Sequence, residues 1–160
     1  MKIFKNLVVP ILVITSFAFS SDGLAQQPNG QTAPPVAWLA EDDIDRFVTT
    51  MPQIRAEFEQ LGLDHESDPN LWMTHAKAQE ILAKYGWDQL SFAPKWAAIV
   101  AGYAFTKMSA QLELMPAEEK AQAEQYMGTM LTQYKNSVHE NDIALIKSKM
   151  ATLDAMFENE

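Results

Sequence analysis

Apolar residues recur at helical spacing from Trp38 to the C-terminus of this chain. No stretch alternates polar and apolar residues for long enough to predict a β-strand. Each predicted helix has one apolar stripe, which must be buried against another helix. The pattern therefore predicts an all-α fold, a four- or five-helix bundle over residues 38–160. The clearest stripe is formed by Ile44, Phe47, Val48, Met51, Ile54, Phe58 and Leu61.

Glycine and proline mark where the first two helices should end or bend. The first helix is predicted over residues 41–61. Pro52 lacks a backbone donor and collides with the carbonyl one turn earlier, so we expect a kink or a break near Thr50. The second helix is predicted over residues 69–85, and it should end where Gly86 adopts a left-handed C-cap conformation.

Three further helices are predicted in the second half of the chain. After a short helical turn, Ser91 should cap a helix that continues to Leu114. The next helix is predicted over residues 117–134, with acidic residues in its first turn. The last helix should begin at Glu140 or Asn141 and continue to the C-terminus.

The N-terminal region is expected to lie outside the helical domain. Two lysines precede an apolar run at residues 7–19, and Gly23 and Ala25 place small side chains at the cleavage-defining positions. This arrangement is typical of a secretory signal peptide, predicted over residues 1–25. The run is shorter than the roughly 20 residues that span a bilayer, so no membrane insertion is expected after cleavage. Residues 26–37 are predicted to form a flexible Pro/Gln-rich linker, and the protein should be periplasmic or secreted.

Charge and cysteine content exclude several functions. The chain has 12 basic and 21 acidic residues, a net charge of −9, and no cysteine. An acidic chain without a basic run is repelled by phosphate backbones, so nucleic-acid binding is not expected. Disulfides and covalently attached haem are impossible without cysteine.

The sequence contains no recognisable catalytic or metal-binding motif. There is no G-x-S-x-G motif, and the three histidines lack partners at the spacing that zinc uses. The loop at residues 64–70 has acidic or amide residues at alternate positions, as in the first half of a calcium-binding loop. Pro69 stands where that loop needs glycine, and His75 stands where it needs glutamate. We therefore expect no enzyme activity, no metal and no cofactor.

Aromatic residues are concentrated around the predicted second and third helices. One interpretation is a packed corner in which they fill the junction between these helices. The other is a groove that accepts an apolar ligand or a partner helix. The candidate groove residues are Trp72, Tyr85, Trp87, Phe92, Trp96 and Tyr103.

Three segments resemble a loose group of small exported helical proteins of Gram-negative bacteria, whose function is uncharacterised. They are residues 39–47, residues 85–96 and residues 143–157. The resemblance implies a periplasmic helical domain and supplies no catalytic residue. Together with the composition, it leads us to expect a non-catalytic binding or adaptor protein whose partner is an envelope protein or peptide. The alternative is a carrier of a small apolar ligand, or of non-covalent haem, in the bundle core.

Overall fold

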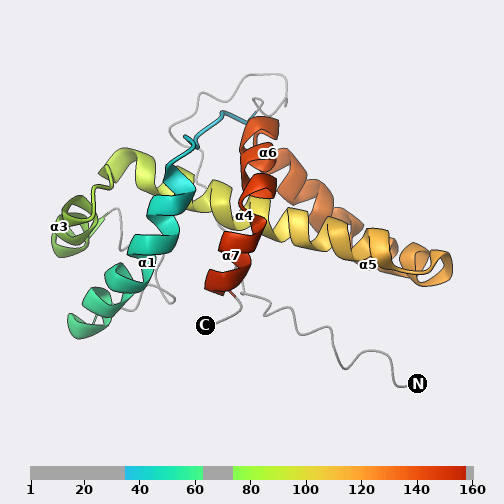
Figure 1. Cartoon of the computed structure of the whole chain (residues 1–160), viewed down its shortest axis with the longest axis horizontal. Coiled ribbons are helices and arrows are strands. Elements are labelled where there is room, and N and C mark those ends of the chain that lie inside the picture. Colours follow the sequence, from blue (N-terminus) through green and yellow to red (C-terminus); the bar gives the residue numbers. More distant parts are fainter. Residues whose placement is uncertain (1–34, 63–73, 158–160) are drawn as a thin grey trace. The chain divides into compact units, whose positions relative to one another are not determined.

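A computed structural model describes residues 35–62 and 74–157, all within a unit that spans residues 34–160. The predicted signal peptide and the loop at residues 64–70 lie outside the described residues. Every regular element in the described part of the chain is an α-helix (Figure 1). The predicted all-α fold is therefore confirmed.

Six helices are described, whereas four or five were predicted. The last predicted helix is in fact two, because the chain leaves helical geometry at Lys149. The Lys149 ammonium reaches the Asp45 carboxylate at 2.8 and 2.9 Å, and the helix that follows brings Leu153 and Met156 into the core. The helices are α1 (Asp43–Gln60), α3 (Ala76–Lys84), α4 (Gln89–Leu114), α5 (Ala117–Ser137), α6 (Glu140–Ser148) and α7 (Met150–Phe157).

The structure also corrects the predicted N-cap of α4 and rules out one of the two effects predicted for Pro52. Helix α4 begins before Ser91, and its N-cap is Asp88, whose carboxylate accepts the Ser91 backbone N–H at 2.9 Å. Helix α1 continues through Pro52, so the predicted break near Thr50 does not occur, whereas a kink there stays a prediction. Pro52 is exposed, whereas the neighbouring Met51 is fully buried, so the apolar stripe of α1 stays packed across the proline.

The turn after α3 directs a large aromatic side chain into the core. Gly86 has φ 78°, as the predicted C-cap requires. Its N–H donates to the Ala83 carbonyl at 3.0 Å, and the Trp87 N–H donates to the Leu82 carbonyl at 2.9 Å. These two bonds are the Schellman pattern that ends a helix. As a result Trp87 is only 3% exposed.

The hydrophobic core is built by α1, α3, the first half of α4, α6 and α7. Its fully buried members come from elements far apart in the sequence. Helix α5 contributes no buried residue and packs against α4 (Figure 1). The core is formed by Ile44, Phe47, Met51, Ile54, Phe58, Ala78, Ile81, Leu82, Trp87, Phe92, Ile99, Ile146, Leu153 and Met156.

Helices α4 and α6 approach closely at Gly102, and this contact makes a testable prediction. A β-carbon at Gly102 would overlap the δ-carbon of Ile146, which is fully buried. At Gly128 in α5 nothing lies within 4 Å of an added β-carbon. Overpacking at Gly102→Ala should cost about 1–3 kcal/mol, and the better helix propensity of alanine returns roughly 0.5–1 kcal/mol, so we expect a net loss in the free energy of unfolding of up to about 2.5 kcal/mol. The matched variant Gly128→Ala should raise it by roughly 0.5–1 kcal/mol, because alanine is the better helix former.

Urea unfolding of both variants measures these two effects. The further change Ile146→Val removes the overlapping carbon, so the double variant with Gly102→Ala should cost less than the sum of the single changes. Equal stability of the two alanine variants would show that the helices do not meet at Gly102.

Candidate functional site

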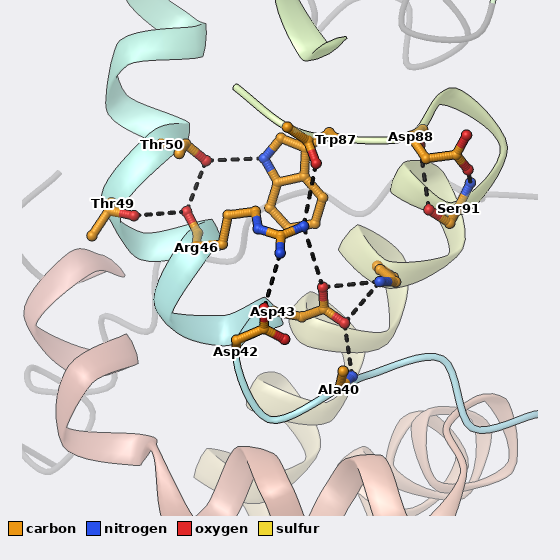
Figure 2. A network of polar contacts seen from close by, with 11 residues as sticks. Ala40, Asp42, Asp43, Arg46, Thr49, Thr50, Trp87, Asp88 and Ser91 are labelled. Carbon is orange, nitrogen blue, oxygen red and sulfur yellow. Dashed lines mark hydrogen bonds and ion pairs between the residues drawn. The ribbon is translucent and has the colours of Figure 1, made fainter. Parts of the chain in front are cut away.

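A polar network joins the start of α1 to α4 (Figure 2). The Asp43 side chain is only 2% exposed, and its carboxylate lies 2.8 Å from the Lys95 ammonium. It also accepts the Ala40 backbone N–H at 2.7 Å. This is a buried carboxylate with an ion-pair partner and a backbone donor, so the charge is compensated within the protein.

Arg46 extends this network to the turn between α3 and α4. Its guanidinium lies 5.4 Å from the centre of the Trp87 ring, donates to the Gly86 carbonyl at 3.2 Å and pairs with Asp42 at 2.9 Å (Figure 2). The Trp87 indole N–H in turn donates to the Thr50 hydroxyl at 3.0 Å. These polar groups are engaged with one another, so the network holds α1 against the turn.

The structure brings five of the six predicted groove residues around one core. Trp87 and Phe92 lie inside it, with ring centres 5.2 Å apart in an edge-to-face arrangement. Tyr85, Trp96 and Tyr103 are partly buried and pack against the same core. This is the arrangement that a packed corner between α3 and α4 requires. The sixth residue, Trp72, lies outside the described residues, and a ligand groove at these aromatics stays a prediction.

Tyr103 is held by partners on α4 and α7. Its hydroxyl donates to the Asp154 carboxylate at 2.9 Å, and Lys107 pairs with the same carboxylate at 2.7 Å. Its ring lies 4.6 Å from the Phe157 ring. These contacts attach α7 to α4.

Tyr85 belongs to a three-residue cluster between α1 and α3. The Glu57 carboxylate accepts hydrogen bonds from the Tyr85 hydroxyl and, at 2.7 Å, from the Lys84 ammonium. The hydrogen bond from Lys84 and the one from Tyr85 lower the pKa of Glu57. The hydrogen bond to Glu57 raises the pKa of Tyr85, and desolvation raises it further.

We expect Glu57→Gln to lower the pKa of Tyr85 toward its ordinary value of 10.0, because the change removes the carboxylate that stabilises the neutral phenol. Carbon-13 NMR of the tyrosine rings through an alkaline titration measures this pKa, and Tyr126, which is 84% exposed, is the internal control. Since the pKa of Tyr85 is raised in the folded state, its contribution to stability is complete below pH 10.0 and is lost as the pH rises through the folded-state pKa. An unchanged Tyr85 titration would contradict the contact with Glu57.

Asp142 is a structural residue that the sequence reading missed. It is 1% exposed, and its carboxylate accepts the backbone N–H groups of Trp38 and Leu39 at 2.9 and 3.1 Å. The donors are 104 and 103 residues away in the sequence. The only sequence signal was an acidic residue in the first turn of a helix, which the helix dipole already explains. These two hydrogen bonds hold residues 38–39 against the start of α6.

A surface groove lies between α4, α5 and α6. Its volume is about 390 Å³. Four of its lining residues follow the spacing of a single face of α6, and one each comes from α4 and α5. The lining combines an apolar floor with charged groups: Phe105, Lys135, Glu140, Ile143, Ala144 and Lys147.

Residues 35–62 and 74–157 contain neither a group of side chains arranged to hold a metal ion nor a helix able to cross a membrane. No three His, Asp or Glu side chains there are grouped so that they could hold a metal ion. None of the helices described is both long enough and apolar enough to cross a membrane.

Comparisons with known proteins find no match to the chain among protein families, curated proteins or solved structures.

Proposed function

We propose that this protein is a non-catalytic binding or adaptor protein of the cell envelope, and that it binds an envelope protein or peptide through α5. The observation that supports the proposal is the exposure of this helix. Although α5 has 21 residues, none of them is buried. A helix normally buries one stripe against its neighbours.

The inner side of α5 is only partly covered. Met127, Leu131 and Tyr134 are half-buried on this helix, which packs against α4, and partial burial raises the pKa of Tyr134. On another face, Tyr126 and Met130 lie one turn apart and are 84% and 45% exposed. Tyrosine and methionine are enriched at protein interfaces, because they offer large apolar area with an adaptable or hydrogen-bonding end. The outer face of α5 is the surface on which a partner helix or peptide would be buried.

Photo-crosslinking in intact cells tests this proposal. A photoreactive amino acid at Tyr126 or Met130 should give a discrete crosslinked species, which mass spectrometry can identify. The same amino acid at Gln53, exposed on α1, is the matched control and should give no such species. Equal capture at all three positions, or no capture at any, would contradict partner binding through α5.

A second variant separates specific contact from chance proximity. Met130→Glu places a charge in the proposed interface, so it should abolish the crosslink from position 126. Because Met130 is 45% exposed, thermal unfolding of the variant should match that of the unchanged protein. A crosslink at position 126 that survives the added charge would argue against this interface.

The alternative is a carrier of a small apolar ligand or of non-covalent haem, for which we also propose a test. A carrier of this kind needs an enclosed cavity in the bundle core. Titration of the purified protein with haemin should then produce a Soret band. No band, together with unchanged thermal unfolding, would dismiss haem.

A further inference from the structure

The groove between α4, α5 and α6 has an apolar floor at the protein surface. Phe105 and Ile143 are half-buried, and Ala144 is exposed beside them. Their side chains leave an open volume of about 390 Å³. Small-molecule sites usually measure roughly 300–1,000 Å³ and are mostly apolar with a few polar groups. The groove has the size and lining of a site for a small ligand.

The two lysines of the groove have no carboxylate partner, unlike most other lysines that the structure describes. Within residues 35–62 and 74–157, no carboxylate lies within ion-pair distance of Lys135 or Lys147. Among the other lysines in these ranges, only Lys77 also lacks a carboxylate at that distance. The remaining lysines each lie within 4.0 Å of a carboxylate: Lys84, Lys95, Lys107, Lys120 and Lys149.

Two unpaired lysines in one groove are unexpected for an acidic chain. Acidic residues outnumber basic ones by 21 to 12, so carboxylates are available to pair with most lysines. Glu140 lines the same groove, near the N-terminal end of the α6 dipole, so the charged groups of the groove are two ammonium groups and one carboxylate. Lysine stems can lie along apolar surface while the ammonium groups stay in water. Lys135 and Lys147 therefore give the groove two cationic groups beside an apolar floor.

We propose that this groove binds a small anionic amphiphile, namely a carboxylate carried on a medium-length hydrocarbon chain. The hydrocarbon would lie against Phe105 and Ile143, which removes apolar surface from water on both sides. The carboxylate would lie near the ammonium groups of Lys135 and Lys147. This site goes beyond the proposed function, since it lies apart from Tyr126 and Met130.

Titration with sodium decanoate tests the proposal on the protein as purified from cells. Methyl NMR of Ile143 and Ala144 should show saturable shifts, while the methyls of Ile44 and Leu153 in the core stay unchanged. Decyltrimethylammonium has the same chain length and the opposite charge, so it should bind at least tenfold more weakly. Equal binding of the two probes, or shifts that spread to the core, would overturn the proposal.

Paired variants test the role of the two lysines. The double change Lys135→Gln with Lys147→Gln should weaken decanoate binding roughly threefold to tenfold, as expected for two exposed charge contacts. The matched control is the double change Lys77→Gln with Lys120→Gln, which alters the net charge by the same amount as the first double change. It should leave the affinity for decanoate within about twofold of that of the unchanged protein. Both double variants should unfold at similar temperatures, since the changed side chains are exposed or half-exposed.

Unchanged decanoate affinity in the Lys135 and Lys147 variant would overturn the proposal, as would an equal loss in the control variant. Either result would leave partner binding through α5 intact, because the crosslinking at positions 126 and 130 does not use the groove. Conversely, failure of that crosslinking would not affect decanoate binding.

Discussion

Replacing Trp87 with alanine is expected to lower the free energy of unfolding by roughly 3–5 kcal/mol, the range for truncating a large aromatic residue in a core. The Trp87 side chain is 3% exposed, and its ring packs edge-to-face on Phe92. The change also removes the indole N–H that donates to Thr50 and the ring surface below the Arg46 guanidinium. Urea unfolding measured by circular dichroism gives the loss.

Trp38→Ala is the matched control for this experiment. Trp38 is 43% exposed, and its bond to Asp142 uses the backbone N–H, which alanine keeps. We therefore expect a loss below about 1 kcal/mol. Equal losses at the two positions would contradict the packed corner. Unchanged stability of the Trp87 variant, with loss of ligand or partner binding, would favour the aromatic groove instead.

Breaking the Asp43–Lys95 ion pair is the second change with a large expected effect. Lys95→Met leaves a carboxylate that is 2% exposed with only the Arg46 guanidinium, at 3.9 Å, as a cationic neighbour, so the loss should reach at most about 3–5 kcal/mol. Asp43→Asn should cost somewhat less, because the Lys95 side chain is 19% exposed and its ammonium can reach water. The asparagine side chain can still accept the Ala40 N–H.

The double variant separates the ion pair from the packing around it. With both charges removed, the loss should be smaller than the sum of the single losses by about 1–3 kcal/mol, measured as the coupling in a double-mutant cycle. The exposed pair of Arg46 and Asp42 is the control, and Asp42→Asn should cost less than about 1 kcal/mol. A loss in the double variant equal to the sum of the two single losses would show that the charges of Asp43 and Lys95 do not interact.

The two proposed binding surfaces share only helix α5 and use different residues of it. The outer face of α5 presents Tyr126 and Met130, whereas the groove uses Lys135 near the end of α5 together with one face of α6. Neither surface was recognised in the sequence, where aromatic residues at 85–103 gave the strongest signal. Aromatic content alone does not distinguish a binding surface from a core, because the difference is whether the aromatic side chains are buried or exposed.

Local signals predicted most of the secondary structure. The predicted apolar stripe of α1 contains five residues that are buried, but it also contains Val48, which is half-buried, and Leu61, which is 44% exposed. Gly86 predicted the end of α3. These features depend on residues a few positions apart, so the sequence displays them directly. The N-cap of α4 was placed three residues late, because Ser91 and Asp88 are both good capping residues and propensity does not choose between them.

Contacts between distant residues were decided by the tertiary structure alone. Asp43 reaches Lys95 across 52 residues, and Asp142 reaches Trp38 across 104. The break at Lys149 also depends on distant partners, since it brings Leu153 into the core and the Lys149 ammonium to Asp45. The sequence by itself determined a helical fold, because helical periodicity is local and repeats along the chain. Only the tertiary structure decided which carboxylates are buried, which lysines stay unpaired and which helix face is uncovered, because each of these depends on how the helices meet.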